Sequence, residues 1–120
     1  AGLPEYKGFY LRPLLGGRRS RGVHGYNGVD LANACGTAVM ASAPGTVIVA
    51  RTGGWNGGYG LYAVITHANN TQTLYGHLSS LAVASGDLVT QGAPIGTLGS
   101  TGNSTGCHVH FEVRGARNPF

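Results

Sequence analysis

Two histidines placed two residues apart, His108 and His110, have the clearest chemical potential in this sequence. Residues 107–114 are predicted to form a strand, because valine and phenylalanine at one set of alternate positions leave the histidines and Glu112 on the other face. Residues two apart on a strand lie roughly 6.6 Å from each other, so both imidazoles are expected to face the same space. The glycine- and serine-rich run at 99–106 predicts a loop that a ligand can approach closely. The pair fits an active-site floor, although an isolated His-x-His pair favours an exposed polar face.

The five histidines and four acidic residues of the chain are of types that suit Zn²⁺. A catalytic zinc takes three protein ligands and keeps a fourth position open. His24 and Asp30 lie in the segment HGYNGVD, whose glycines allow both side chains to converge, and His77 ends a predicted strand. Each also has a purely structural interpretation, such as a solvated loop histidine or an aspartate that caps a turn. Spacing alone leaves open which three residues bind metal, and no His-Glu-x-x-His motif supplies a glutamate base.

Short strands punctuated by glycine and proline are predicted to position these side chains. The predicted strands, the first of them a strand or merely an extended segment, are 9–15, 46–51, 61–67, 72–78, 87–90, 95–98 and 107–114. The stretches expected to be loops, or at most a single turn in the last case, are 22–34, 53–60 and 79–84. Asn69 and Asn70 favour an antiparallel hairpin between two of the strands. No segment keeps a helical period over ten residues. The expected fold class is therefore all-β, a mostly antiparallel curled sheet or small sandwich.

Length and composition narrow the classes of protein that fit. The 120 residues suffice for one domain with a real core, and we expect a single domain over 1–120 with a flexible lead-in at 1–8. No apolar run approaches the roughly 20 residues that span a bilayer, so no membrane insertion is expected. The net charge of +4 is accompanied by no lysine-rich stripe or aromatic platform, which disfavours nucleic-acid binding. The basic residues grouped early in the chain are Arg12, Arg18, Arg19 and Arg21.

Five motifs extend over nearly the whole chain: HGYNGVD, GTAVMASAPGTVIVA, TLYGHLS, VASGDLVTQGAPIGTLGSTGNSTG and CHVHFEVRG. Together, over roughly residues 9–119, they resemble the lysostaphin and LytM type of zinc metallopeptidase, family M23. The resemblance implies the lysostaphin-type fold, one zinc ion per chain and an endopeptidase that hydrolyses peptide cross-links or stem peptides of bacterial peptidoglycan. It also implies a location outside the cell or in the cell envelope, and we expect a monomer. The opening residues carry no signal-peptide pattern, so any leader is expected to be removed or to lie outside this sequence.

The resemblance implies a role for each of five residues. The implied zinc ligands are His24, Asp30 and His110, and the implied catalytic residues, which act on the attacking water and the oxyanion, are His77 and His108. The family usually places its first histidine four residues before the aspartate, whereas here Tyr26 holds that position and the histidine lies six residues before it. Glycines at 22, 25 and 28 favour a longer loop that still brings the histidine to the metal.

Two other classes of function share parts of the pattern. The run SGDLVTQGAPIGTLGS also resembles a biotinyl or lipoyl carrier module, but the sole lysine, Lys7, is far from any hairpin tip, so this interpretation fails. A catalytically inactive wall-binding or regulatory domain of the same fold is the remaining alternative. An inactive relative is expected to lack a ligand or a catalytic histidine, and here all five positions are filled.

Several further residues have expected roles. Cys35 and Cys107 are expected to be bridged, because secreted domains usually pair their cysteines and a bond here would join the two loops that lead to the site. Glu112 fits equally a partner that orients a catalytic imidazole and a surface strand residue. His67 is expected to be structural or solvent-facing. The aromatic residues considered for a peptide groove are Tyr10, Tyr26, Trp55, Tyr59 and Tyr75, of which Trp55 and Tyr75 fit the core equally.

Overall fold

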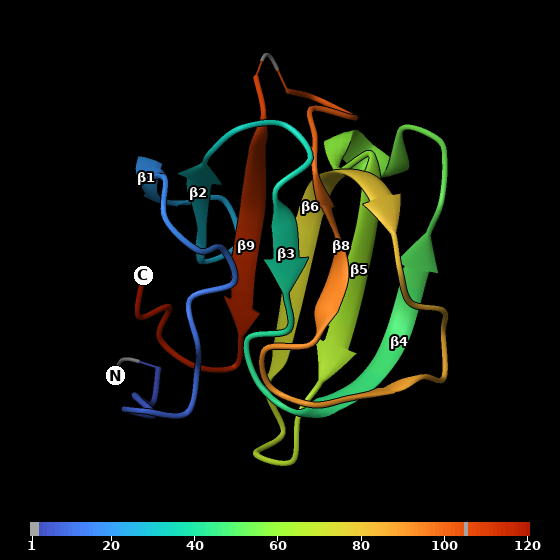
Figure 1. Cartoon of the computed structure of the whole chain (residues 1–120). Coiled ribbons are helices and arrows are strands. Elements are labelled where there is room, and N and C mark those ends of the chain that lie inside the picture. Colours follow the sequence, from blue (N-terminus) through green and yellow to red (C-terminus); the bar gives the residue numbers. More distant parts are fainter. Residues whose placement is uncertain (1–2, 105) are drawn as a thin grey trace.

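The computed structural model describes residues 3–104 and 106–120, and strands make up nearly all of its regular structure (Figure 1). In chain order the elements are β1 (Arg18–His24), β2 (Gly28–Ala32), β3 (Ala38–Met40), β4 (Gly45–Arg51), the 3-10 turn η1 (Asn56–Gly58), β5 (Leu61–Thr66), β6 (Gln72–Leu81), β7 (Leu88–Val89), β8 (Pro94–Leu98) and β9 (His108–Arg114). The predicted all-β class is confirmed. Among the described residues, no helix has the length and apolar character needed to cross a membrane.

The strands form one antiparallel sheet that curls over. Seven of them follow the order β1-β2-β9-β6-β5-β4-β7, while β3 and β8 lie off this path, with β8 pairing both β3 and the end of β6. Figure 1 shows β3 and β8 lying across the face of the main sheet. Their buried side chains join the core cluster, in which Tyr75 of β6 and Phe111 of β9 pack with ring centroids 5.3 Å apart. The expected curled antiparallel sheet is confirmed.

β9 occupies the middle of the sheet, with β2 on one side and β6 on the other. Its valine and phenylalanine side chains are fully buried in the core, as their alternation predicts. The opposite face carries the histidines and Glu112, and this face is also covered: Glu112 is 1% exposed and His110 is 7% exposed. The polar face of a surface strand is usually open to water. The burial of polar side chains on this face of β9 therefore indicates a functional site.

The early part of the chain differs most from the expectation. Residues 22–34, predicted as a loop, contain β2 and the end of β1, which pair as a hairpin through a turn where Gly25 and Asn27 have positive φ. The loop prediction was wrong because glycines at 22 and 28 lie within strands here, and because β2 is too short to show a clear strand pattern of its own. The segment 9–15 contributes a single bridge, from Leu14 to Val39, and is otherwise irregular.

The later strands agree better with the sequence pattern. β4, β5, β7 and β8 fall within the predicted ranges to within one or two residues, and the turn between β5 and β6 places Asn70 at positive φ. The single helical turn predicted at 79–84 was wrong, because β6 continues to Leu81, where it pairs with β8. The three-residue strand β3 was not predicted, since so short a segment carries no measurable period.

A disulfide joins Cys35 and Cys107, whose Cα atoms lie 5.3 Å apart, and this confirms the expected pairing. Cys35 follows β2 and Cys107 immediately precedes β9. The bond therefore ties together the ends of two adjacent strands that both carry candidate site residues.

Candidate metal centre and active site

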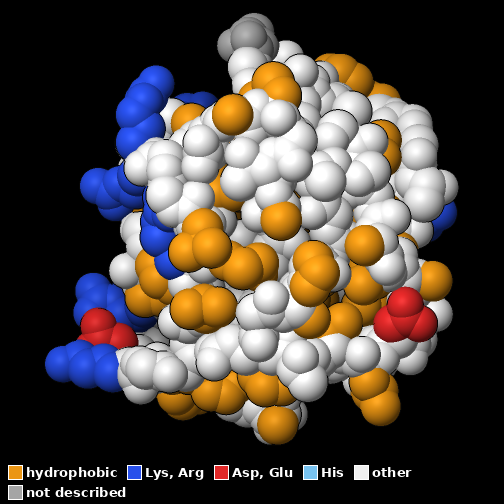
Figure 2. Space-filling model, in the orientation of Figure 1, with side chains coloured by type: hydrophobic (Ala, Val, Ile, Leu, Met, Phe, Trp, Pro, Cys, Tyr) orange, Lys and Arg blue, Asp and Glu red, His pale blue; other side chains and the backbone are white. Residues whose placement is uncertain are grey.

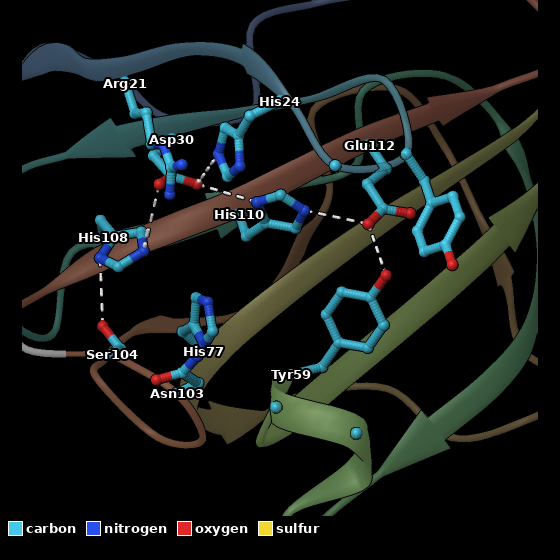
Figure 3. A pocket seen from close by; sticks show the side chains of 14 residues that line it. Arg21, His24, Asp30, Tyr59, His77, Asn103, Ser104, His108, His110 and Glu112 are labelled. Carbon is cyan, nitrogen blue, oxygen red and sulfur yellow. Dashed lines mark hydrogen bonds and ion pairs between the residues drawn. The ribbon is translucent and has the colours of Figure 1, made fainter.

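Three adjacent strands bring the candidate residues to one face of the sheet. Asp30 on β2 lies directly opposite His110 on β9 in the antiparallel register. His77 lies on β6, the strand on the other side of β9, and His108 precedes His110 by two residues on the same face. His24 ends β1, which pairs with β2. Figure 3 shows these side chains around one pocket.

His24, Asp30 and His110 converge so closely that one ligand atom from each lies within 4.8 Å of the others. Nδ1 of His110 lies 2.8 Å from Oδ1 of Asp30, and Nε2 of His24 lies 3.1 Å from the same oxygen. The turn at 25–27, with positive φ at its glycine and its asparagine, accommodates the six-residue spacing. Tyr26 at the middle of this turn is 76% exposed and is not a member of the cluster.

The donor set of this cluster, two imidazole nitrogens and a carboxylate, fits a zinc ion. Nε2 of His24 is buried and has no hydrogen-bond partner among the described residues, because its close approach to Asp30 lacks hydrogen-bond geometry. A buried polar atom of this kind is costly unless a ligand satisfies it. Burial opposes the ionisation of Asp30, but the hydrogen bond from His110 and the charge of His108 outweigh it and lower the pKa of Asp30 to about 2. A permanently charged carboxylate at this point attracts a cation.

The second ring nitrogen of His110 is held by Glu112, with Nε2 2.9 Å from Oε2. The Glu112 carboxylate also accepts hydrogen bonds from the hydroxyl of Tyr59 at 2.5 Å and from the guanidinium of Arg114 at 3.1 Å. Because the carboxylate accepts, Nε2 of His110 carries a proton and Nδ1 is directed at Asp30. Burial disfavours a charge on His110, yet its hydrogen bonds to Asp30 and Glu112 raise its pKa to about 9. A cation bound by Nδ1 would replace the proton held there.

The structure supports the interpretation of Glu112 as a residue that orients an imidazole, but the imidazole is not one of the two that were expected. Its carboxylate contacts His110 rather than His77 or His108. The sequence places Glu112 on the correct face of β9, but the alternation does not indicate which ring it reaches.

His77 and His108 lie beside this cluster, with their ring centroids 4.8 Å apart. Nδ1 of His77 lies 2.8 Å from the carbonyl oxygen of Thr101, and Nδ1 of His108 lies 3.0 Å from that of Gly106. A carbonyl oxygen only accepts hydrogen bonds, so both Nδ1 atoms carry a proton, and in the neutral form of either ring Nε2 carries the lone pair. Their orientation is thus the reverse of that of His110. Nε2 of His108 lies 3.7 Å from Oδ2 of Asp30.

The backbone of His77 has a left-handed conformation, with φ of 63°. This conformation costs a residue with a side chain about 1–3 kcal/mol, so it persists only where the surrounding contacts hold it. The N–H of His77 donates to the carbonyl of Tyr59 at 2.7 Å, and the ring donates to Thr101. Burial is the main cause that lowers the pKa of His77 below 6.5, so its ring is neutral at pH 7. A neutral imidazole held in a fixed position suits a general base.

Comparison with known proteins shows what kind of protein carries this site. Residues 24–120 match the model of Peptidase family M23. The chain belongs to this family. The DD-carboxypeptidase/endopeptidase Mpg of Neisseria meningitidis is 43% identical over 107 residues, 89% of this chain and 23% of that protein. The murein hydrolase activator EnvC of Escherichia coli is 36% identical over 98 residues, 82% of this chain and 23% of that protein. The chain thus spans less than a quarter of the length of either relative.

Solved structures agree on the fold. The catalytic domain of the antimicrobial peptidase lysostaphin from Staphylococcus simulans superposes with a TM-score of 0.67 and 34% identity, covering 92% of this chain and 74% of that chain. A zinc containing peptidase from Vibrio cholerae gives a TM-score of 0.68 and 34% identity, covering 93% of this chain and 35% of that chain. The curled sheet described above is therefore the lysostaphin-type fold of family M23.

The M23 pocket is an open hollow of about 530 Å³ that the four histidines share with residues from two loops. Tyr59 enters it from the loop after β4, and Asn103 and Ser104 enter from the loop before β9 (Figure 3). Oγ of Ser104 lies 3.1 Å from Nδ1 of His108, a contact that sequence reasoning missed. The serine's place in the glycine-rich loop just before the histidine strand is the signal that was available.

The remaining aromatic and histidine expectations have mixed outcomes. Tyr26 and Tyr59 line the pocket, as expected. Tyr10 is 8% exposed and Tyr75 is 0% exposed, and both belong to the core. The groove prediction was therefore wrong for Tyr10, and the core alternative is supported for Tyr75. Trp55 is 61% exposed, so it is not a core residue, and it is not among the residues lining this pocket.

His67 has a structural role. It is 5% exposed, so the solvent-facing alternative was wrong. Its Nδ1 donates to the carbonyl of Pro44 at 2.8 Å, and its Nε2 lies 2.8 Å from Oγ1 of Thr73. These contacts connect the start of β4 to β6 at a distance from the pocket lining.

Proposed function

We propose that this chain is the zinc-dependent endopeptidase domain of a peptidoglycan hydrolase. The observation that supports it best is the division among the pocket histidines. His110 is held at Nε2 and turns Nδ1 towards Asp30, next to His24. His77 and His108 are held at Nδ1, so that in their neutral forms Nε2 carries the lone pair. The first arrangement suits metal binding and the second suits proton transfer.

His24, Asp30 and His110 are the proposed ligands of one zinc ion. A zinc ion held there would supply a Lewis acid that polarises the scissile carbonyl and lowers the pKa of the attacking water to roughly 7. The ligands come from two adjacent strands and the end of a third, and the disulfide after β2 joins two of those strands, so the set is held in place before the ion binds.

His77 and His108 are proposed to handle protons and the oxyanion. A free Nε2 accepts the proton of the attacking water and returns it to the leaving amine. The other imidazole, once protonated, donates a hydrogen bond to the oxygen on which negative charge develops. Both rings are already fixed by carbonyl groups at Nδ1, so neither must reorient during the reaction.

The names of the relatives support a peptidoglycan peptide as the substrate. Mpg is named a DD-carboxypeptidase/endopeptidase, and its similarity covers 89% of this chain. We therefore place the substrate among stem peptides and cross-links, and the protein in the cell envelope or outside the cell. We further propose that the chain acts as a single domain and a monomer.

A regulatory domain of the same fold is the second candidate, because EnvC is named a murein hydrolase activator. The two functions make opposite demands on the pocket. A domain that only activates another enzyme has no use for ligands or for positioned imidazoles, yet the pocket holds a complete set of both. This completeness favours the enzyme.

The test combines metal analysis with an assay on peptidoglycan fragments, in which mass spectrometry detects new peptide termini. We expect one zinc per chain and hydrolysis by the wild type. His24→Ala is expected to lose both. His77→Ala and His108→Ala are expected to keep zinc while hydrolysis falls by a factor on the order of 10²–10⁴. Trp55→Phe, at an exposed aromatic residue that is not among those lining the pocket, is the control and should behave as wild type.

Each other outcome has a defined meaning. Zinc retained in His24→Ala contradicts the ligand set. Zinc bound by the wild type without hydrolysis of any fragment favours the regulatory function. If His108→Ala loses zinc while His110→Ala keeps it, the two roles on β9 must be exchanged.

A further inference from the structure

We propose that Arg18 and Arg21, on the edge strand β1, form a subsite that binds a carboxylate of the peptide substrate. This inference rests on the proposed function and adds a preference for anionic peptides to it. β1 is the last strand of the sheet order on this side, next to the strand that carries Asp30. The two arginines lie on the side of β1 that faces the pocket.

The register of β1 determines which side chains face the pocket. Arg19 pairs with Leu31, which is 1% exposed and faces the core. Arg18 pairs with Ala32 and Arg21 with Asp30, so both lie on the opposite face, where the site is. The one-residue irregularity between 19 and 21 is essential for this placement. Without it, the serine at position 20 would lie opposite Asp30, and bulges of this kind commonly redirect a side chain next to an active site.

A second hollow adjoins the pocket along this strand. Its lining includes both arginines together with Asn33, and it shares Arg21, Asp30 and His108 with the pocket itself. A peptide that reaches the proposed catalytic histidines from this side therefore passes over the arginines. The close-up view shows Arg21 beside Asp30 at the rim of the pocket (Figure 3).

The charges of this region are not neutralised within the described part of the chain. No carboxylate there lies within 4 Å of the guanidinium nitrogens of Arg18 or Arg21, and both side chains are exposed. Asp30 is engaged by the three imidazoles around it. Figure 2 shows Lys and Arg side chains gathered along the edge of the molecule where β1 lies. An anionic group on a ligand would therefore neutralise the positive charge of this edge.

A single carboxylate fits this subsite better than a polyanion. Of the described residues, two bring a guanidinium group to the hollow, since Arg19 on the other face donates to the carbonyl of Phe120. Guanidinium groups bind carboxylates through two parallel hydrogen bonds, which fixes the position of the bound group as well as its charge. An acidic residue near the scissile bond of a peptide provides that partner.

The test uses two synthetic peptides that differ at one position, a free side-chain carboxylate in one and its carboxamide in the other. Wild type is expected to cleave the carboxylate peptide with roughly 10-fold higher kcat/KM, mostly through KM, as expected for the loss of one charge-assisted interaction. Arg21→Gln and Arg18→Gln are expected to reduce this preference towards 1, and Arg21→Lys to restore part of it. Arg51→Gln, an exposed arginine on β4 outside both hollows, should keep the preference.

A second measurement separates this inference from the proposed function. Peptide binding is titrated directly on the zinc-loaded protein, where Arg21→Gln must weaken binding of the carboxylate peptide and leave that of the carboxamide unchanged. Equal losses for both peptides, or no preference in wild type, overturn the subsite. A wild type that binds with the preference but cleaves neither peptide contradicts the proposed function and supports the subsite.

Discussion

Gly28 on β2 lies against the ring of His110, and replacing it with alanine tests whether the position of that ring controls metal binding. An added Cβ would lie 2.5 Å from Cε1 and 2.7 Å from Nε2 of His110. Its φ lies outside the left-handed region, so alanine is tolerated by the backbone itself. The substitution therefore acts mainly on the space available to the imidazole, and more weakly on its partner Glu112, whose Cγ would lie 3.1 Å from the added Cβ.

The size of the effect follows from this geometry. Ordinary contact begins near 3.4 Å, so the ring must retreat by the difference from 2.5 Å, about 0.9 Å. The ring is held between Asp30 at 2.8 Å and Glu112 at 2.9 Å, so it cannot retreat without lengthening a hydrogen bond. Overpacking of this kind costs about 1–3 kcal/mol of stability. A ligand displaced from its supporting partner weakens metal affinity about 10–100-fold, and a shift of about 1 Å lowers the hydrolysis rate roughly 100-fold.

The assay is zinc competition against a chromophoric chelator, followed by the hydrolysis assay and thermal unfolding of the metal-free protein. Gly22→Ala is the matched control, because Gly22 lies on the adjacent strand β1, has ordinary φ and has no atom within 4 Å of its added Cβ. The variant at 22 is expected to bind zinc as wild type does. Equal zinc affinity in the two variants would refute the reasoning, since the ring would then not set the strength of the site.

Two further predictions concern stability. Reduction of the Cys35–Cys107 bond, which closes a separation of 72 residues, is expected to lower the free energy of unfolding by about 4 kcal/mol, measured by urea denaturation with and without reductant; a change below about 1 kcal/mol would contradict this. His67 has its pKa lowered by burial, so the unfolded chain takes up a proton near pH 6.5 and the folded protein only at lower pH. Stability is therefore lost as pH falls below about 6.5, with a slope of at most about 1.4 kcal/mol per pH unit. His67→Gln should remove this contribution in urea titrations at pH 7.5 and pH 5, and an unchanged slope would show that another group is responsible.

The sequence predicted the elements whose residue types carry a local signal. β9 alternates apolar and polar side chains, β5 is rich in β-branched residues, and an asparagine turn marks the start of β6, whose end was placed three residues too early. β1 and β2 were missed because neither carries such a signal. β1 is rich in arginine and exposed along most of its length, and β2 is only five residues long and begins at a glycine next to the turn. Their pairing is decided by tertiary neighbours, and no local pattern records it.

The same distinction applies to the site. Residue types and the resemblance identified the five pocket residues, since chemistry restricts which side chains bind zinc or move protons. The contacts that orient them depend on register and loop geometry. Glu112 reaches His110 because it lies two residues further along one strand face, and Tyr59 reaches Glu112 from a separate loop. The bulge in β1 that places Arg21 opposite Asp30 likewise has no signature in the order of residues.

The two histidines of β9 have different proposed roles, although they lie on one strand. His108 and His110 have the same side chain and lie on the same face, and nothing in the alternation distinguishes them. The difference comes from what each ring contacts at its far nitrogen. The loop before β9 provides a carbonyl group, which fixes Nδ1–H of His108 and frees Nε2. The strand itself provides Glu112, which fixes Nε2–H of His110 and leaves Nδ1 directed at Asp30. Carboxylate partners raise the basicity of a ring and favour a ligand, and the hydrogen bonds to Asp30 and Glu112 raise the pKa of His110 to about 9. The partner of each imidazole, rather than its position on the strand, is therefore the basis for proposing His110 as a metal ligand and His108 as a group that moves a proton.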